Sequence, residues 1–577
     1  MDESLAPLQW LDVLLPVVRR SGARDRVCFA DLTGGREDPV MGLDCPHPLL
    51  ALSFELLATH ILQIAYPPPD ERTWRQRLFD PPSPAALRDA LAPYREAFVL
   101  WGSDTPFLQV KPLSAWESKP QNLGVLFFDA PTEGAKEKHR DFFIKRGCAV
   151  ALHAAFLAPL LYSDNALFCT GGGGYLGVPH KNHSPKYQVR GRTLWETLWL
   201  NVLDLSRDHK ALWPVPMDGR AFPWLREDVR RLDLGRQTEH LKKKRTEAKQ
   251  KVLETVIPVG IGDRHPAGFV MPRRYLLDPP RQGVCGLSGE VGWVFETYQR
   301  WTQGLSYSSE GWVWPCVAPL EKIDAEGRSQ GRWYAQASSP LRLEDWLSPA
   351  LGHEPPPPEG KSGVIVHSPP VVRALAGRLG ELVDAFENVT GEQAAVISAP
   401  TPELPFSIKV ITLFYLDSDK QVDGLSERSL PLYPVAGDAR LSVVSDATHL
   451  ARAVADVARA LARRAATVLK AGNSDARPTL PGQLSDALMR SLEGPVLAAL
   501  PQIIESLRDP DPDVARAAVR DALLQQARKK ALDLFDEAFP LSFPDASARA
   551  IAQARRDLRK DLWGVPPAQR KKKEVSP

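Results

Sequence analysis

The stretch LFCTGGGGYLGVPHKNHS (residues 167–184) holds four consecutive glycines and, shortly after them, two histidines that flank a lysine. Gly171, Gly172, Gly173 and Gly174 offer backbone N–H and C=O groups with no Cβ atom to shield them, so this segment is able to lie flush against a ligand. A dinucleotide fingerprint requires its glycines between a strand and a helix. Here the glycines follow an apolar helix and precede a proline-broken loop, which excludes that cofactor. A flexible loop stays open as an alternative.

The two histidines, His180 and His183, are the only closely spaced pair in the chain. Their spacing could suit a metal ion, but prolines flank them and no third ligand lies nearby. The six cysteines form no C-x-x-C pair, and the common phosphate-binding, metalloprotease and nucleophile motifs are absent. We therefore expect no metal, no cofactor and no catalytic residue. A metal-dependent hydrolase or nuclease that uses His180 and His183 is the alternative.

Cations follow the glycines. Lys181, Arg190 and Arg192 indicate a locally basic surface of the kind that contacts phosphates. The minor groove of DNA presents a degenerate pattern of acceptors, which a glycine backbone can contact as well as many side chains can. Close approach to DNA is therefore one hypothesis for this segment.

The whole chain sets limits on that hypothesis. Among 577 residues, 72 basic and 70 acidic side chains give a net charge of +2, so a site for a polyanion must be a local patch. The N-terminus lacks the basic region and cleavage site of a secretory signal. The longest apolar helix is expected at residues 149–162, short of the ~20 residues that a bilayer requires. These features predict a cytoplasmic protein without a membrane span.

Residues 1–435 read as a mixed α+β domain. Strand-like runs (DRVCFADL, GVLFFDAP, GWVFETYQRW and IKVITLFYL) alternate with expected helices at 48–65 and 143–162. A basic insertion is expected at about 225–255, and a proline-rich linker at 352–363.

The amphipathic helical pattern of residues 436–565 predicts a four-helix bundle. The first helix is expected to begin at Ser445 or Asp446 and the second, residues 483–507, to break near Glu-Gly-Pro. The third begins with an acidic proline cap and the fourth ends at Gly564. The basic tail, 566–577, is expected to be disordered.

Several of these stretches together resemble one family. CAVALHAAFLAPLL, TGGGGYLG and YQVRGRTLWETLWLNVLDL are similar to the helix, glycine loop and following helix of the large subunit of the type I-E CRISPR Cascade complex, the CasA or Cse1 family. WLDVLLPVVRRSGARDRVCFADL, SDTPFLQVKPL and FYLDSDKQVDGLSERSLPLYP resemble further segments of that family in the same order. The four-helix bundle resembles its second domain.

The resemblance implies a protein that is not an enzyme. Such a subunit recognises the protospacer-adjacent motif (PAM) in target double-stranded DNA through the minor groove, promotes strand separation, and recruits a helicase-nuclease. Its other partners are the 5′ handle of the CRISPR guide RNA and the backbone, small and handle-binding subunits of Cascade. In such complexes base pairing reads the long sequence and protein reads the short entry signal. A purely architectural subunit is the other alternative.

The resemblance also assigns roles to residues. It implies that Gly171–Gly174 contact the PAM and that Gln421, preceded by Lys420, is the wedge at a hairpin tip. In VGIGDRH, Asp263 stands where relatives carry a lysine finger, and Arg264 or Lys420 are the candidates to replace it. Residues that the resemblance places at the guide-RNA handle or a neighbouring subunit are Gln121, Asn122 and Phe127.

For the bundle, the resemblance favours contact between basic residues and DNA or the small subunit, with a solvated helix face as the alternative. The candidates are Arg463, Arg464, Lys529, Lys530, Arg555 and Arg559. Cys285 stands alone where some relatives have a cysteine cluster, so no zinc site is expected.

Overall fold

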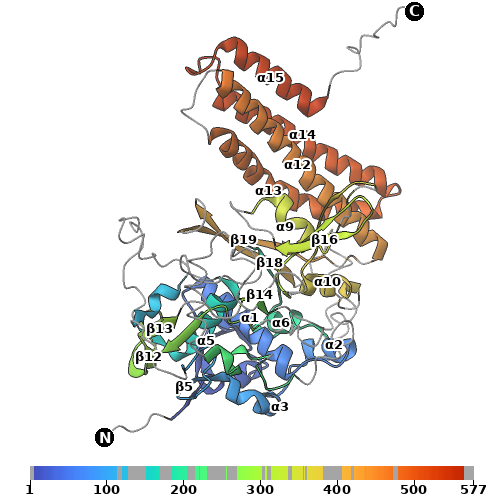
Figure 1. Cartoon of the computed structure of the whole chain (residues 1–577). Helices are drawn as coiled ribbons and strands as arrows, with labels where there is room; N and C mark the ends of the chain where they lie inside the picture. Colours follow the sequence, from blue (N-terminus) through green and yellow to red (C-terminus); the bar gives the residue numbers. More distant parts are fainter. Residues whose placement is uncertain are drawn as a thin grey trace, which may run out of the picture. The chain divides into compact units, whose positions relative to one another are not determined.

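A computed structural model gives the arrangement of most of the chain (Figure 1). It describes residues 6–112, 120–127, 151–168, 184–204, 215–219, 221–230, 255–256, 269–301, 306–307, 314–334, 341–354, 357, 360–380, 382, 406–416, 421–433, 435, 437–471 and 479–564. The described parts of Met1–Pro340, Glu354–Gly391 and Leu404–Leu432 form unit 1, and those of Leu341–His353 and Tyr433–Pro577 form unit 2.

Unit 1 is a mixture of short sheets and helices. Its helices are α1 (Pro48–Ala65), α2 (Glu71–Phe79), α3 (Pro84–Leu91), α5 (Ala154–Tyr162), α6 (Leu194–Leu200) and α10 (Pro370–Ala376). Its strands are β1 (Leu8–Gln9), β2 (Leu15–Arg19), β3 (Arg24–Val27), β4 (Val40–Leu43), β5 (Val99–Trp101), β6 (Gln121–Asn122), β7 (Leu152–His153), β8 (Lys186–Arg190), β9 (Thr255–Val256), β10 (Arg274–Leu277), β11 (Arg281–Val284), β12 (Val291–Phe295), β13 (Thr297–Trp301), β14 (Ser306–Tyr307), β15 (Pro319–Ile323), β16 (Ser329–Tyr334), β17 (Gly363–Val366), β18 (Ser407–Leu416) and β19 (Gln421–Pro431).

These strands form small sheets of two or three strands. The sheet orders are β1-β5, β3-β2-β4, β10-β13-β6, β11-β12-β7, β14-β9, β16-β15-β17 and β19-β18-β8. Among the described pairs only β14 and β9 run parallel. The mixed α+β class predicted for this part of the chain is confirmed.

Helix α1 lies in the core of unit 1 and packs against α5 and α6. Pro48 occupies its first turn, where a missing N–H costs nothing. Of the described helices, α1 alone is long and apolar enough to cross a membrane, and 83% of that apolar window is buried inside the protein. Burial on nearly every face is what a core helix requires.

The apolar helix expected at 149–162 is shorter than predicted. Leu152 and His153 form β7, which pairs with β12, and α5 begins only at Ala154. The Nδ1 atom of His153 accepts the N–H of Ala155 at 3.2 Å, so this histidine caps the helix and does not lie inside it. Helix α1 is therefore the longest apolar helix of the described chain.

The strand-like runs fold in different ways. IKVITLFYL is β18, as predicted, whereas GWVFETYQRW is divided into β12 and β13 at Glu296. DRVCFADL ends its strand at Val27 and continues as a 3-10 helix, Phe29–Thr33. The run GVLFFDAP begins inside a 3-10 helix, Leu123–Leu126. The Asn122 side chain caps this helix by accepting the Gly124 N–H at 2.8 Å. That part of the run was wrongly predicted as a strand.

Unit 2 is helical. Its elements are α9 (Leu343–Ala350), α12 (Gly437–Ala471), α13 (Leu480–Glu505), α14 (Pro512–Ala538) and α15 (Ala548–Trp563). Helix α12 contacts all four others, so it forms the centre of the unit. The four C-terminal helices, coloured orange to red in Figure 1, agree with the predicted bundle.

Two helix boundaries differ from the prediction. Helix α12 begins at Gly437, so Asp446 is not an N-cap; it is buried and accepts hydrogen bonds from Arg516 at 2.8 Å and from Arg520. Helix α13 continues through Pro495, because the buried side chains of Leu492 and Val496 offset an interior proline's cost of ~3 kcal/mol. The predicted acidic proline cap of α14 and the stop at Gly564 are present.

Unit 2 also includes a segment that the sequence placed in the N-terminal domain. Helix α9 packs against α12, and its Trp346 and Leu347 are fully buried. The chain leaves unit 2 between His353 and Glu354, within the expected linker 352–363. Of the expected basic insertion, 231–254 lies outside the described residues, as does the tail 566–577.

Candidate nucleic-acid interface

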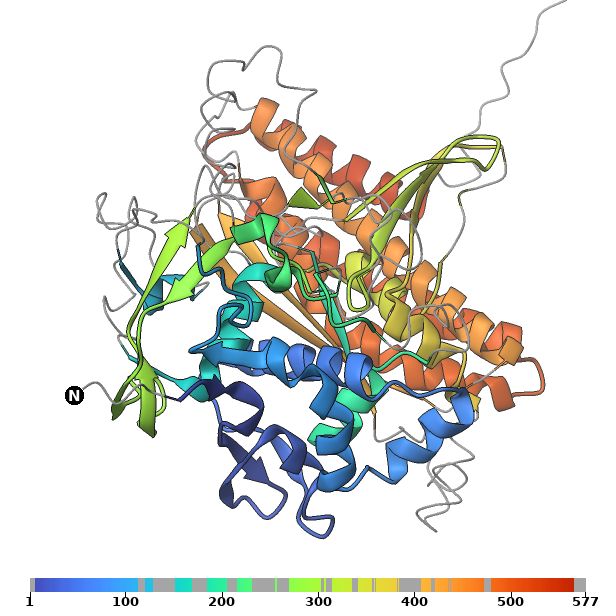
Figure 2. The same ribbon diagram turned by 60° about the horizontal axis from the view of Figure 1, so that its bottom comes forward.

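A long β-hairpin carries the predicted wedge residue. Strands β18 and β19 pair from Ser407 opposite Pro431 to Leu416 opposite Gln421, and they run side by side in Figures 1 and 2. Gln421 is thus the first residue of β19, directly after the turn. The turn itself, with Lys420, lies outside the described residues. The hairpin predicted from IKVITLFYL is confirmed as a backbone structure, although the last four residues of the turn-rich DSDKQVDG belong to β19.

The third strand of this sheet follows the glycine segment in sequence. In β8, Lys186 lies opposite Ile411 and Arg190 opposite Ser407. Leu416, the end of β18, is five positions beyond Ile411, or about 17 Å along an extended strand. The chain therefore enters β8 from the side of the sheet where the β18–β19 turn lies. Gly171–Gly174, Lys181, His180 and His183 lie outside the described residues, as do Asp263 and Arg264.

Arg190 and Arg192 are each bound by a buried carboxylate. Arg190 donates to Glu55 of α1 and, at 3.2 Å, to the side chain of Gln188. The Arg192 guanidinium donates to Glu196 of α6 at 2.6 and 3.1 Å. Glu55 and Glu196 are only 7% and 5% exposed. The arrangement favours a structural role for both arginines over the phosphate contacts expected from the sequence.

The start of α6 explains why a glycine separates these arginines. A Cβ atom on Gly191 would lie 2.4 Å from the Cβ of Glu196, closer than real Cβ atoms come. Thr193 caps the helix by accepting the Glu196 N–H at 3.2 Å. The Glu196 carboxylate accepts the Arg192 N–H at 2.7 Å, which completes a capping-box-like exchange.

Asn201, which the sequence analysis did not identify, connects the end of α6 to β8. The Oδ1 atom of Asn201 accepts the Val189 N–H at 3.0 Å, and its Nδ2 donates to the Val189 carbonyl at 2.7 Å. An asparagine just after an apolar helix is a known helix-end signal and would have pointed to this position. Asn201 acts as a one-residue strand partner for the edge of β8 that faces away from β18, beyond the point where Tyr187 donates to the Cys316 carbonyl at 2.7 Å.

Tryptophans attach α6 to α2. The indole N–H of Trp195 donates to the Arg77 carbonyl at 2.8 Å, and that of Trp199 donates to the Trp74 carbonyl at 2.7 Å. The Trp74 indole in turn donates to the Val202 carbonyl at 2.8 Å. Because all three N–H groups bond to backbone, the segment RGRTLWETLWLN acts as a brace between β8, α1 and α2, and we call it the α6 brace (residues 190–201).

The three candidates for the guide-RNA handle all have intramolecular contacts. Gln121 accepts the Tyr298 hydroxyl at 3.2 Å, and Asn122 caps the 3-10 turn that follows it. Phe127 is only 6% exposed and its ring lies 4.9 Å from that of His47. Phe127 therefore offers little surface to a partner, whereas Gln121 and Asn122 are half-buried.

The candidate cations of unit 2 fall into two groups. Arg464 makes two hydrogen bonds to Asp561, at 2.8 and 2.9 Å, and Arg555 makes two to Asp536, at 2.6 and 2.7 Å. The other candidates form no ion pair with any carboxylate that the structure describes; they are Arg463, Lys529, Lys530 and Arg559. Only this second group has uncompensated charge.

Within the residues that the structure describes, no group of three histidine, cysteine, aspartate or glutamate side chains is placed to hold a metal ion. Cys28, Cys45, Cys285 and Cys316 are free thiols.

The family model described as CRISPR-associated protein Cse1 matches residues 12–534. The solved structure of Thermus thermophilus CasA (Cse1) is similar at 17% identity, covering 97% of this chain and all of that one, with a TM-score of 0.57. Cse1 from Acidimicrobium ferrooxidans gives 18% identity, 96% and 100% coverage, and 0.55.

A chain of a CRISPR RNA-guided surveillance complex is similar at 16% identity, covering 96% of this chain and 99% of that one, with a TM-score of 0.61. No curated protein sequence matches. At these identities the solved structures show the shared fold, while the family model covers most of the sequence.

Proposed function

The chain belongs to the CRISPR-associated Cse1 family, the large subunit of the type I-E CRISPR surveillance complex, and from this membership we propose that it reads the PAM of target DNA through the minor groove and starts strand separation. The subunit has no catalytic role in this proposal. It works in the cytoplasm within Cascade, bound to the guide-RNA handle and to the backbone, small and handle-binding subunits, and it recruits the helicase-nuclease once the target strands are open.

The observation that carries the proposal is the placement of Gln421. It follows the turn of a hairpin whose strands pair from Ser407 to Leu416 with one register shift between Phe414 and Tyr415, and that hairpin is joined by β8. The strand that follows the glycine segment enters the sheet from this same side. A wedge must be rigidly supported, because unstacking one base step costs a few kcal/mol. Pairing with β18, β8 and the α6 brace supplies that support.

The division of work between residues follows from their chemistry. Gly171–Gly174 present backbone groups to base edges without side-chain bulk. Positive charge near the groove comes from Lys181, Lys420 and Arg264. It does not come from Asp263, which stands where relatives carry the lysine finger. Arg190 and Arg192 hold β8 in place through Glu55 and Glu196.

The proposal is tested with the assembled complex carrying Gln421→Ala. Duplex binding should stay close to wild type, because phosphate contacts dominate affinity, while the rate of strand separation should fall at least about tenfold, the effect of ~1.4 kcal/mol on a barrier. Fluorescence of 2-aminopurine beside the PAM measures this rate. The exposed Gln282→Ala is the matched control. Strand separation at the wild-type rate would show that Gln421 is not the wedge.

The glycine assignment needs its own variant. Gly172→Leu should weaken binding to PAM-containing duplex while leaving the binding of non-specific duplex unchanged, because only the groove contact requires a bare backbone. Equal loss on both duplexes would indicate a general folding defect. No loss on either would favour the architectural alternative.

A further inference from the structure

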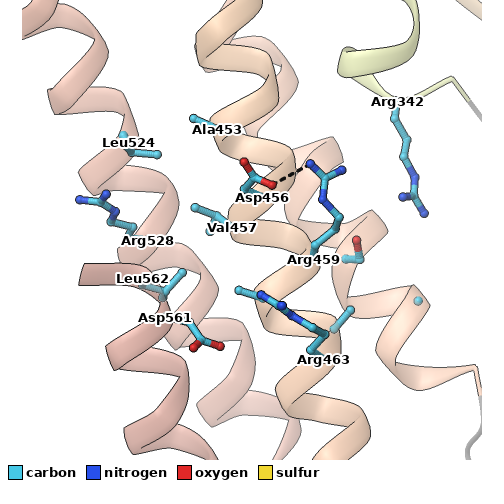
Figure 3. A pocket seen from close by; sticks show the side chains of 14 residues that line it. Arg342, Ala453, Asp456, Val457, Arg459, Arg463, Leu524, Arg528, Asp561 and Leu562 are labelled. Carbon is cyan, nitrogen blue, oxygen red and sulfur yellow. Dashed lines mark hydrogen bonds and ion pairs between the residues drawn. The ribbon is translucent and has the colours of Figure 1, made fainter. Parts of the chain in front are cut away.

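Unit 2 contains an open groove of about 720 Å³ between its helices (Figure 3). Helices α12, α13, α14 and α15 contribute to its wall, and Arg342, just before α9, lies at one side. Four arginines and two aspartates line it, together with small and aliphatic side chains. Every lining residue belongs to unit 2.

The groove exists because small residues face it. On α12, Ala453, Val457 and Ala460 recur at the spacing of one helical face. On α13 the facing residue is Gly482, and a Cβ atom added there would meet no other atom within 4 Å. Larger side chains at these positions would fill the space. The floor is therefore apolar and hollow.

Part of the charge at the rim is compensated within the protein. Arg459 pairs with Asp456 at 2.8 Å, drawn as a dashed line in Figure 3, and Arg342 pairs with Asp486 at 2.8 Å. Asp561 is bound by Arg464. These residues shape the rim but offer little unbalanced charge.

Two arginines remain. Arg463 is exposed, and Arg528 lies on α14 with its guanidinium 5.9 Å from the Trp563 ring. Neither has a carboxylate partner among the residues that the structure describes, and the Nε atom of Arg528 is buried there without a hydrogen-bond acceptor. An anionic group in the groove would therefore gain from both cations.

We propose that this groove binds an acidic amphipathic segment of a partner protein. Carboxylates of that segment pair with Arg463 and Arg528, while its aliphatic side chains rest on Val457, Leu524 and Leu562. Along α12 the groove runs from Ala453 to Arg463, about 15 Å at 1.5 Å per residue, which suits about three turns of a helix laid in a groove.

The floor argues against a nucleic acid strand as the occupant. Single strands bind mainly by stacking bases on aromatic rings. None of the described lining residues is aromatic, and the ring of Trp563, beside Arg528, lies outside the lining. An aliphatic floor with guanidinium groups above it fits leucine and glutamate side chains better. This interaction goes beyond the proposed reading of DNA and does not depend on it.

The test uses the full chain without DNA and a fluorescein-labelled helical peptide of about three turns built from glutamate and leucine. Anisotropy should show binding that weakens with added salt, and the same peptide with lysine in place of glutamate should not bind. Arg463→Gln combined with Arg528→Gln should weaken binding at least about tenfold, since two charge-assisted hydrogen bonds are lost.

A second variant separates this effect from a folding defect. Gly482→Leu fills the groove from a helical position with open space and should also weaken binding at least tenfold, whereas Arg549→Gln, at an exposed position outside the groove, should bind as wild type. No peptide binding, or binding that is unchanged in Gly482→Leu, would overturn the proposal. So would an oligothymidylate that binds in place of the peptide and is lost in the same variants, because it would identify a nucleic acid groove.

Discussion

Asn201 satisfies both backbone polar groups of Val189, accepting its N–H at 3.0 Å and donating to its carbonyl at 2.7 Å. The same side chain donates to the Thr197 carbonyl at 2.7 Å. One asparagine thus joins the end of α6 to the edge of β8 that faces away from β18. Since β8 supports the hairpin that carries Gln421, the α6 brace and the proposed wedge are mechanically connected.

Replacing Asn201 by Ala should leave the N–H and carbonyl of Val189 buried without partners. We expect a loss of at least about 2 kcal/mol in the free energy of unfolding of unit 1, since each of the two orphaned buried groups costs about 1–3 kcal/mol. Hydrogen exchange at the Val189 amide should become faster, and urea unfolding measures the total. Gln282→Ala, on an exposed position, should change neither.

Variants of Arg190 and Glu55 can distinguish a structural role of Arg190 from a DNA-binding role. If the pair braces β8 against α1, Arg190→Gln and Glu55→Gln should each destabilise the chain, and the double variant should be no less stable than either single variant. Glu55→Gln should then leave the salt dependence of duplex binding unchanged. A phosphate-binding role for Arg190 predicts instead that Arg190→Gln lowers the salt slope by about one.

The two groups of cations in unit 2 should behave differently. Arg464→Gln and Arg555→Gln remove two-fold hydrogen bonds to Asp561 and Asp536 and should lower stability with little effect on DNA binding. Lys529→Gln and Arg559→Gln remove uncompensated charge, so each should weaken duplex binding by the assembled complex and reduce its salt slope. Equal slopes for all four variants would show that ion pairing does not decide which cations meet DNA.

His367 makes the stability of unit 1 depend on pH. The hydrogen bond to Glu354 at 2.8 Å raises the pKa of His367 above 6.5, against the effect of burial, and its other nitrogen lies 2.6 Å from Glu321. Hydrogen bonds, first from Ser329 and then from His367 and Arg332, lower the pKa of Glu321 to about 2. Arg373 also faces Glu354.

His367 and Glu321 give the stability opposite dependences on pH. The His367 contribution is complete below pH 6.5 and is lost as pH rises through the raised pKa of the folded protein, while the Glu321 contribution is complete above pH 4.5 and is lost as pH falls toward 2. Urea unfolding across this range should show His367→Gln removing the loss of stability at higher pH. His449→Gln, at an exposed position, should keep it.

How far the sequence could predict this molecule depended on whether a signal was local. Pro48 at the start of α1, the acidic cap of α14 and Gly564 after α15 mark their helix ends through contacts within a few residues. Asp446 carries the same kind of local signal, yet its partners Arg516 and Arg520 lie on another helix. Because Asp446 forms ion pairs with these two arginines, it lies inside α12 and does not cap the start of that helix.

The site shows the same limit. The hairpin before Gln421 was predictable from alternating residues and a turn-rich segment. The partner of Arg190 was not, because Glu55 is distant in sequence, whereas Glu196 stands only four residues after Arg192 and was a local signal that the sequence analysis did not use. Only the fold shows that these charges are already neutralised.

Helix α9 carries a practical consequence for dissecting the protein. Its Trp346 and Leu347 are buried and it packs on α12, yet it precedes β17, β18 and β19 in the chain. A fragment that starts at Tyr433 would lack α9 and expose the apolar surface of α12 beneath it, and a fragment that stops at Leu432 would carry α9 with no surface to cover. Neither truncation yields a fragment with a complete apolar core. The helices of unit 2 are therefore best produced alone by fusing residues 341–353 to the segment that begins at Tyr433.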